Sequence, residues 1–193
     1  MDSDTNADTD TDAPADVRTR AYDPATDRSA LWHLKRGFEL GLGEGTGEDA
    51  KRERYETKLD ERYRDGYLEW VDRCLEAEPN AVTIAAVDSS EQTADGSEVD
   101  DLVGYVFVLP ESMAYIWDSA VLNELYVAPD YRGTGVADRL MERALEIVAD
   151  QDLPLERLVL DVDRDNDRAK AFYDQYGFEH WGEMVVRPVP DGS

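Results

Sequence analysis

The order of apolar patterns along the chain limits its fold more than any other feature of the sequence. Two stretches with apolar residues at helical spacing, 24–40 and 49–77, come before three β-rich runs at 80–88, 102–110 and 119–129. Helices repeat their apolar face every three to four residues and strands every two, so each change of period indicates a new element. This part of the chain therefore predicts two helices followed by three strands.

The same patterns continue to the end of the chain, and a short strand is also expected near its start, at 17–22. After the third β-rich run, helical spacing returns at 134–151 and 165–177, and each of these segments is followed by a β-rich one, at 157–163 and 178–189. The predicted order is β, α, α, β, β, β, α, β, α, β. It indicates an α/β or α+β domain in which helices cover the faces of a mixed sheet.

Local signals give several of these elements expected ends. Asp23 and Pro24 suit the N-cap and first helical position of the first helix, which we expect to stop in the glycine-rich segment 41–48. The long acidic segment 89–101 separates the first two β-rich runs, so these runs are expected to form a hairpin with an inserted tip. Gly177 is expected to end the last helix.

The start of the chain differs in composition from the rest. Residues 1–16 hold six aspartates, no basic residue and no aliphatic residue larger than alanine beyond Met1. Such a segment has too little apolar surface to fold, so we expect a disordered acidic tail. The remaining residues, 17–190, have the length of one domain with a single core.

The charge of the chain is extreme but spread along its whole length. The formal net charge is −25, and only four of the 20 basic residues are lysines, at positions 35, 51, 58 and 170. Concentrated salt screens charge within a few ångströms, so a lysine-poor acidic surface indicates a halophilic source. The acidity is then mainly a solubility device and gives no evidence for a cationic substrate. Because the sequence shows no basic patch, binding to nucleic acid is not expected.

The remaining chemical signals in the composition are few. Cys74 is the only cysteine, which excludes an intramolecular disulfide and a cysteine-based metal site. His33 and His180 show no metal-ligand spacing, so no metal site is predicted. No apolar run approaches the length of about 20 residues that a membrane span needs. The N-terminus lacks the basic and apolar parts of a secretion signal, and we expect a cytoplasmic protein without membrane partners.

A glycine-containing turn opens the helix expected at 134–151. It follows a strand and Pro129, and it has the pattern Arg132-Gly133-x-Gly135-x-Ala137. The Lys-Ser/Thr pair of a Walker A loop is missing, and an aspartate stands where a dinucleotide-binding fingerprint needs its third glycine. Glycines let the backbone approach a ligand closely, and the N–H groups of a helix start suit a pyrophosphate. Taken alone, a plain turn before a helix explains the pattern equally well.

A second motif follows about thirty residues later, on the helix expected at 165–177. It reads Asn166-x-x-Ala169-x-x-x-Tyr173-x-x-x-Gly177-Phe178. With both motifs in this order and spacing, the chain resembles the GNAT superfamily of N-acetyltransferases. The resemblance is strongest over residues 120–180 and extends, by element order alone, over 17–188. It implies a GNAT fold, with a mixed central sheet of about six to seven strands flanked by about four helices.

The resemblance implies that acetyl-CoA is a co-substrate and indicates where it binds. The backbone of the glycine turn would cradle the pyrophosphate, with the Arg132 side chain near a phosphate, and the strand 122–127 would hydrogen-bond the pantetheine arm. A β-bulge in this strand is a feature of the family. Asn166 would contact coenzyme A, cap its own helix, or do both. The implied cofactor-binding residues are Leu125, Tyr126, Val127, Arg132, Gly133, Thr134, Gly135, Val136, Ala137, Asn166 and Tyr173.

The resemblance also implies two catalytic residues, Tyr173 and Glu124. Attack of an amine on the thioester expels a thiolate, which the phenol of Tyr173 would protonate; the plainer alternative is a tyrosine packed on a helix face. Glu124 would remove a proton from the amine directly or through water, and Asn123 would orient that water if the bulge turns it inward. One glutamate among 45 acidic residues is a weaker signal than the tyrosine.

The acceptor side is marked only by aromatic residues. Tyr55, Tyr63, Tyr67 and Trp70 repeat at helical spacing and are expected mainly in the core, together with Cys74, which we expect to be inert packing. The family binds its acceptor beside the first two helices and their loop, so some of these rings would line that site, with Gly41–Gly47 giving mobility. Trp117 is a further candidate.

The sequence thus favours an acetyl-CoA-dependent N-acetyltransferase that uses direct transfer, a primary amine as acceptor and no metal. The acceptor, a small-molecule amine or a protein or peptide amine, stays open, as do the acyl-chain preference and the oligomeric state, with which a homodimer is compatible. The alternative is a non-catalytic acyl-CoA-binding regulatory domain of the same fold. A purely structural interaction domain would not need both motifs.

Overall fold

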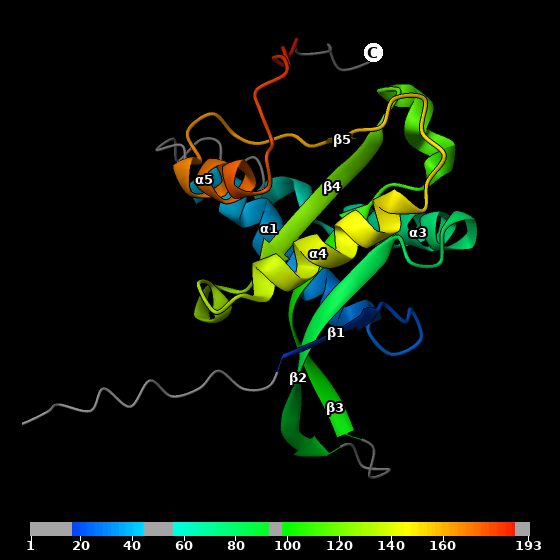
Figure 1. Ribbon diagram of the computed structural model, residues 1–193. Helices are drawn as coiled ribbons and strands as arrows, with labels where there is room; N and C mark the ends of the chain where they lie inside the picture. The colour runs from blue at the N-terminus through cyan, green and yellow to red at the C-terminus, as the bar shows by residue number, and fades with distance from the viewer. Residues whose placement is uncertain (1–16, 45–55, 93–97, 188–193) are drawn as a thin grey trace, which may run out of the picture. The chain divides into compact units, whose positions relative to one another are not determined.

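The computed structural model describes residues 17–44, 56–92 and 98–187 (Figure 1). The chain divides into two compact units, Met1–Asp161 and Val162–Ser193. The expected acidic tail, residues 1–16, lies outside the described residues, so its disorder stays a prediction, as does the extent of a single domain over 17–190.

The first unit is built on a five-stranded sheet with the spatial order β1-β2-β3-β4-β5. Its first four strands run antiparallel to their neighbours, whereas β5 runs parallel to β4, so the expected mixed sheet is confirmed. The register pairs Gln92 of β2 with Glu98 of β3, so the expected hairpin is confirmed, but its strands extend into the acidic segment 89–101 that was expected to connect them, and 93–97 lie outside the described residues. The strands are β1 (Arg18–Ala21), β2 (Val82–Gln92), β3 (Glu98–Val108), β4 (Ala120–Val127) and β5 (Leu158–Val159).

Helices cover both faces of this sheet. Helix α4 (Val136–Ala149) packs on β2, β3 and β4, and Figure 1 shows it in front of the sheet with α1 (Arg28–Glu44) behind it. Helix α1 packs on β3 and β4 and contacts α3 (Glu61–Ala77). Two 3-10 helices, η1 (Glu111–Ile116) and η2 (Pro129–Tyr131), flank β4.

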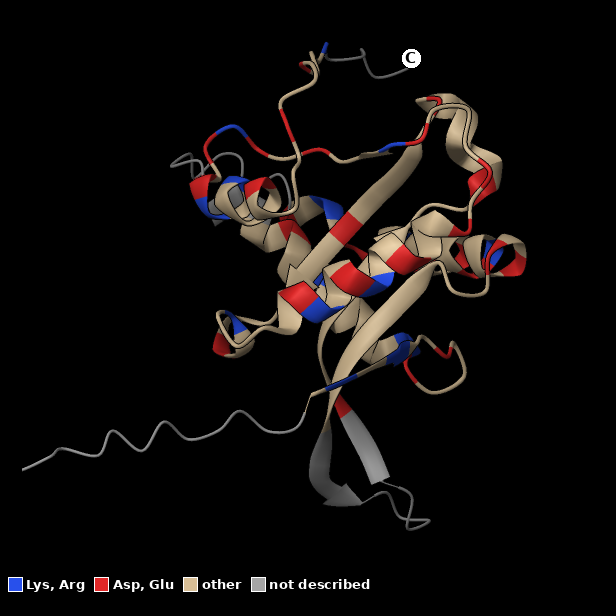
Figure 2. Ribbon diagram, in the orientation of Figure 1, with Lys and Arg blue, Asp and Glu red and all other residues tan. Residues whose placement is uncertain are grey.

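Charged residues lie mainly on the helices and connecting segments, whereas the strands of the sheet are mostly uncharged (Figure 2). On helix α4, Leu140, Met141 and Ala144 are fully buried while Glu142 and Arg143 are exposed. The buried polar or charged residues of the described chain are few: Asp27, Lys35, Glu39, Thr83, Ser119 and Glu124. Three of these, Lys35, Glu39 and Glu124, come together in one place, which is described below.

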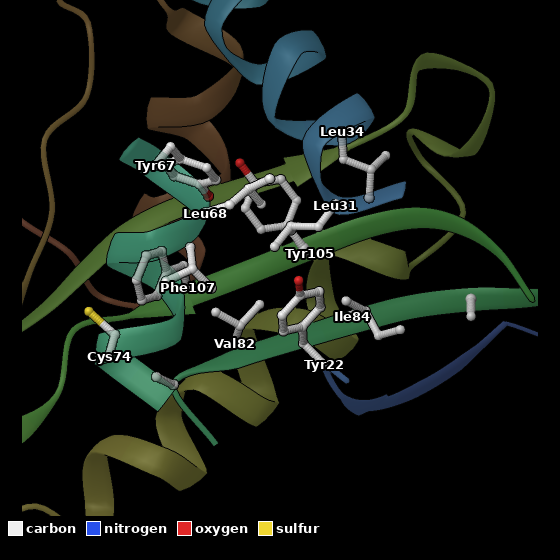
Figure 3. Close-up of a cluster of buried hydrophobic side chains, with 13 residues drawn as sticks. Tyr22, Leu31, Leu34, Tyr67, Leu68, Cys74, Val82, Ile84, Tyr105 and Phe107 are labelled. Atoms are coloured by element: carbon white, nitrogen blue, oxygen red, sulfur yellow. The ribbon is translucent and has the colours of Figure 1, made fainter. Parts of the chain in front are cut away.

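The main apolar core lies between the sheet and the pair α1 and α3 (Figure 3). Leu31 and Leu34 reach it from α1, and Tyr105 and Phe107 reach it from β3. Cys74 also belongs to it, and burial raises the pKa of its thiol, as suits inert packing. Figure 3 shows the hydroxyl groups of Tyr67 and Tyr105 close together at one side of this core.

Two helix starts differ from their sequence-based prediction. The carboxylate of Asp23 accepts the N–H of Ala25 at 2.8 Å and so stabilises a turn at 24–26, whereas α1 begins at Arg28, after Asp27. Helix α3 begins at Glu61 because Asp60 caps it, its side chain accepting the N–H of Tyr63 at 2.7 Å. The expectation of a single helix over 49–77 is therefore wrong at residues 59 and 60, where the helix is interrupted; 56–58 and 61–77 are helical, and 49–55 lie outside the described residues.

The expected number of six to seven strands is also wrong for the described part of the chain, which has five. The segment 157–163 forms only the two-residue strand β5, and 178–187 have no regular secondary structure. In that segment Val185 and Val186 are each 95% exposed. Strand-like composition shows only that a segment suits a sheet; a strand also needs a neighbour to accept its hydrogen bonds.

Gly104 of β3 lies where the backbones of β3 and β4 approach each other closely. A Cβ atom at this position would lie 2.8 Å from the carbonyl oxygen of Tyr126, an atom of the β4 backbone that cannot turn away. We expect Gly104→Ala to lower the free energy of unfolding by about 1–3 kcal/mol. The matched control is Gly41→Ala in α1, where an added Cβ meets nothing within 4 Å. Helix propensity predicts that this control gains up to about 1 kcal/mol. Urea denaturation at constant KCl measures both, and equal stability of the two variants would contradict the close approach.

Candidate active site

Strand β4 contains a β-bulge in the middle of the expected site. Phe107 of β3 pairs with Glu124, but the next residue, Val108, pairs with Leu122, so Asn123 is the extra residue. Regular alternation would place neighbouring side chains on opposite faces of the sheet. Here the Asn123 amide nitrogen instead donates to Glu124 Oε1 at 3.0 Å. The bulge therefore turns Asn123 toward the same side as Glu124.

The second edge of β4 is open along most of its length. Strand β5 pairs with β4 only at Ala120 and Val121, and among the described residues no other strand pairs with that edge. The N–H of Ala128 donates to the carbonyl of Val103 at 2.8 Å, so the Ala128 backbone faces β3. Because facing groups alternate along an antiparallel ladder, the main-chain groups of Leu125 and Val127 face the open edge.

The glycine turn lies between the end of β4 and the start of α4. Gly133 and Gly135 have φ angles of +83° and +82°, a region that favours glycine, and an added Cβ at either would meet nothing within 4 Å. The first hydrogen bond of α4 runs from the N–H of Arg139 to the carbonyl of Gly135 at 3.2 Å. The N–H groups that come before Arg139 in this helix therefore have no acceptor within it.

The side chain of Arg132 turns back toward β4. Its Nε donates to the carbonyl of Val127 at 3.0 Å, and its guanidinium carbon lies 5.7 Å from the centre of the Tyr126 ring. The contact holds the arginine beside the open edge of β4. The hydroxyl of Thr134 donates to the carbonyl of Tyr131 at 2.7 Å, which closes the turn on its other side.

Glu124 is buried and fully hydrogen-bonded. Its Oε1 accepts from Lys35 Nζ at 2.7 Å and from Asn123, and its Oε2 accepts from the hydroxyls of Tyr67 at 3.0 Å and Tyr105 at 2.5 Å. Burial, and then the negative charge of Glu124, raise the pKa of both phenols well above 10.0. Both tyrosines therefore stay protonated and donate to the carboxylate.

A second buried carboxylate, Glu39, lies on the other side of Lys35. Lys35 Nζ is 2.7 Å from Glu39 Oε1, and Lys58 Nζ is 2.7 Å from Glu39 Oε2. The hydroxyl of Tyr63 also donates to Oε1 at 3.0 Å. Burial alone would raise the pKa of Glu39, but the two ammonium groups outweigh it and lower the pKa below its ordinary value of 4.5. Glu39 therefore carries its charge in spite of burial.

Lys35 and Glu124 line a cavity of about 540 Å³, whereas Glu39 and Lys58 are not part of its lining. Tyr63, Tyr67 and Trp70 of α3 also line it, as the family resemblance implied for some of these rings, and they pack in or against the main core, as their spacing predicted. Trp117 is 52% exposed and does not line this cavity, and Tyr55 lies outside the described residues. The full lining is Lys35, Asp60, Arg62, Tyr63, Gly66, Tyr67, Trp70, Asn123 and Glu124.

The second unit contains helix α5 (Asp167–Gln175) with the other motif. The Asn166 side chain accepts the N–H of Ala169 at 3.0 Å and caps the helix, as one of its two expected roles required. The helix ends with the N–H of Phe178 donating to the carbonyl of Tyr173, and the N–H of Gly177 to that of Asp174. With Gly177 at φ +78°, this pattern is a Schellman motif.

Tyr173 lies among aromatic rings in this unit. Its ring centre is 5.5 Å from that of Phe172 and 5.6 Å from that of Phe178, the apolar contact that accompanies a Schellman motif. Burial raises the pKa of Tyr173 to about 12. The phenol is therefore a neutral hydrogen-bond donor throughout the neutral pH range.

Sequence reasoning placed Glu124 and Asn123 in this cavity but missed Lys35, Glu39 and Tyr105. A local signal for two of them was present, since Lys35 and Glu39 stand four residues apart on the apolar stripe of the first helix. Tyr105 shares a face of its strand with buried Phe107, which marks it only as a core residue. The contacts of Lys35 and Tyr105 with Glu124 could not be assigned, because they join residues 89 and 19 positions apart in the sequence.

Two further classes of site are not seen in the described residues. Within 17–44, 56–92 and 98–187, no group of three or more His, Cys, Asp or Glu side chains could hold a metal ion. None of the helices in these ranges is both long enough and apolar enough to cross a membrane.

Solved structures share the fold of this chain at low sequence identity. PH1933 from Pyrococcus horikoshii superposes with a TM-score of 0.59 at 15% identity, covering 88% of this chain and 93% of the other. PaiA N-acetyltransferase from Thermoplasma acidophilum, solved with coenzyme A, gives 0.58 at 20%, covering 84% and 89%. AAC(6')-Iy with a bisubstrate analogue gives 0.56 at 14%, covering 91% and 99%. These similarities show the fold alone.

Sequence relatives are found for a shorter segment. Uncharacterized N-acetyltransferases of Mycobacterium tuberculosis and Mycobacterium bovis are each 39% identical to the chain over 66 residues. The match covers 34% of this chain and 41% of each relative, so it spans about two fifths of their length. The sequence model of the Acetyltransferase (GNAT) family matches residues 45–178, well over half of the chain. The chain therefore belongs to the Acetyltransferase (GNAT) family.

Proposed function

We propose that the protein is an acetyl-CoA-dependent N-acetyltransferase that moves an acetyl group to a primary amine by direct transfer. The observation that carries this proposal is the continuity of the open edge of β4 with the glycine turn at the start of α4. An extended thioester arm and its pyrophosphate need these two features side by side, one supplying main-chain partners and the other N–H groups.

The open edge of β4 fits the pantetheine arm. The main-chain groups of Leu125 and Val127 face that edge, and an arm with amide groups can bond to them like an added strand. The carbonyl of Val127 already accepts Arg132 Nε, but a carbonyl oxygen has a second lone pair. Tyr126 lies between these two residues, and its ring holds the guanidinium of Arg132 beside the edge.

The glycine turn fits the pyrophosphate. Gly133 and Gly135, both at positive φ, have no side chain that would stand in the path of a ligand. The N–H groups of Thr134, Val136 and Ala137 belong to the turn and to the first residues of the helix. Asp138 also lies in the first turn of α4, so the affinity rests on these N–H groups and on Arg132 rather than on an excess of positive side chains.

The transfer needs a proton donor and a proton acceptor. Acetyl-CoA supplies a thioester, whose carbon–sulfur bond breaks as the amine nitrogen bonds to the carbonyl carbon. We assign Tyr173 as the donor to the departing thiolate and Glu124 as the acceptor of the proton from nitrogen. Burial of Tyr173, which keeps its phenol protonated, supports the first role. The position of Glu124 in the lining of the cavity of about 540 Å³ supports its role as proton acceptor.

The nearest competing function is a non-catalytic acyl-CoA-binding domain of the same fold. Both functions need the glycine turn and the edge of β4, whereas only the enzyme needs Tyr173 as a donor. Turnover of acetyl-CoA separates them, and a panel of small amines and peptides would identify the acceptor. We also propose that the acidic surface is an adaptation to concentrated salt, so these assays belong in molar KCl. A cytoplasmic location and a homodimer stay predictions.

Binding of acetyl-CoA is tested by thermal unfolding. A ligand that binds only the folded state at 100 times its Kd adds about 2.7 kcal/mol, which corresponds to a rise in Tm of roughly 5–10 °C for a protein of this size. We expect Gly135→Glu to abolish the rise, because its side chain and charge would enter the pyrophosphate site. Leu145→Glu puts the same charge on a partly exposed position of α4 and should keep the rise. An unchanged Tm of the wild type at millimolar acetyl-CoA would remove the cofactor from the proposal.

Tyr173→Phe tests the proton donor. General acid catalysis contributes about 10²–10⁴-fold, so turnover should fall by about that factor while the KM for acetyl-CoA changes much less. Tyr176→Phe, in the same aromatic group of the second unit, is the control and should keep its activity. Equal turnover of Tyr173→Phe and the wild type would leave Tyr173 as a packing residue only.

A further inference from the structure

The ammonium group of Lys35 is surrounded by the kinds of group that would bind the ammonium of a ligand. Lys35 is 3% exposed, and its Nζ lies 2.7 Å from a carboxylate oxygen of Glu39 and 2.7 Å from one of Glu124. The ring centres of Phe38 and Tyr67 are 4.9 and 4.8 Å away from it. Two carboxylates and two aromatic faces are the groups that recognise a cation in a partly dry site.

Lys35 also leaves Glu124 without a vacant position for a second cation. An ionised carboxylate has about four lone-pair sites. In Glu124 these are used by Lys35, Asn123, Tyr67 and Tyr105. An ammonium ion that bound Glu124 would have to displace one of these donors, and it would share the carboxylate with the ammonium of Lys35 unless it replaced it.

The charges around the cavity balance one another. Its lining holds two basic residues, Lys35 and Arg62, and two acidic ones, Asp60 and Glu124. Glu39, which is not part of the lining, forms ion pairs with both Lys35 and Lys58. The other titratable groups around Lys35 are the phenols of Tyr63, Tyr67 and Tyr105, which reach Glu39 or Glu124. The cavity is therefore aromatic and close to neutral, in a chain whose net charge is −25.

We propose that Lys35 is the built-in counter-ion of Glu124, and that the cavity consequently takes its acceptor as an uncharged amine on an aromatic or apolar carrier, not as an ammonium ion or a polycation. The inference rests on the proposed transfer to an amine and specifies the class of acceptor. Lys35 acts through Glu124 and is thus a positioning residue.

An uncharged amine suits the order of bond formation and proton transfer in the reaction. An uncharged amine can attack the thioester carbon at once, because its lone pair is free. Forming the carbon–nitrogen bond makes the nitrogen far more acidic than an alkylammonium ion, so even a hydrogen-bonded carboxylate can then take its proton. Glu124 accepts that proton after bond formation, at a lone pair that one of its four present donors gives up, and the thiolate leaves with the proton of Tyr173.

The test compares two probes of nearly equal shape, benzylamine and benzyl alcohol, for binding to the whole protein at neutral pH and constant KCl. Benzylamine is mostly charged under these conditions, and benzyl alcohol is not. Ligand-detected NMR with titration gives the two dissociation constants. We expect the wild type to bind benzyl alcohol at least as tightly as benzylamine, and benzylamine to bind more tightly as the pH rises while benzyl alcohol does not change.

Lys35→Met is the decisive variant, because it keeps the length of the side chain and removes its charge. We expect the ratio of the two dissociation constants to shift at least tenfold in favour of benzylamine. Lys35→Arg should keep the wild-type ratio, and so should Arg36→Met, which changes the net charge equally at an exposed position on the same helix.

Several outcomes would overturn the proposal. They are a wild type that prefers benzylamine at neutral pH, a ratio unchanged by Lys35→Met, and no binding of either probe to the wild type at their solubility limits. If Lys35→Met does not fold, the wild-type preference and its dependence on pH still decide. None of these measurements uses acetyl-CoA, so a failure here is distinguishable from a failure of the proposed acetyl transfer.

Discussion

The contact between Lys35 and Glu124 is the interaction on which the candidate acceptor site depends. It joins α1 to β4, while Tyr67 and Tyr105 join the same carboxylate to α3 and β3. Removing one member of a buried ion pair leaves an uncompensated charge, at a cost of about 3–5 kcal/mol. The pair therefore does more than neutralise a buried glutamate. It ties α1 to β4 at the lining of the cavity, and the hydrogen bond from Tyr67 ties α3 to the same carboxylate.

Two irregularities of strand β4, its bulge and its short pairing with β5, shape the candidate site. The bulge at Asn123 turns a polar side chain toward the cavity, and the early end of its pairing with β5 leaves the backbone of Leu125 and Val127 open. A regular strand in the middle of a sheet would offer neither, because its edges would be paired and its side chains would alternate strictly. The side chain of Glu124 therefore lines the candidate acceptor cavity, while the backbone of the residues after it forms the open edge that we propose for the cofactor.

Features set by neighbouring residues could be predicted from the sequence, and features set by distant ones could not. Gly133, Gly135 and Gly177 all have positive φ, a local property that a turn requires and that the residue type reveals. The order of helices and strands followed from apolar periodicity in the same way. The partner of Lys35 is 89 residues away, and no local pattern contains it. The failure of 178–187 to form a strand has the same origin, because pairing depends on an edge elsewhere in the fold.

Because the chain has only four lysines, the positions at which they occur are informative. The three lysines in the described part of the chain, Lys35, Lys58 and Lys170, are all paired with carboxylates. Two of them, the buried Lys35 and the more exposed Lys58, pair with the buried carboxylates of Glu39 and Glu124, so that two positive and two negative charges cancel. On the surface, water and salt screen an excess of acid, so a net charge of −25 is tolerated there. In the interior no such screening exists, and each carboxylate needs its own cation. An acidic chain that keeps lysine at its candidate acceptor site therefore controls the charge of what can bind beside it.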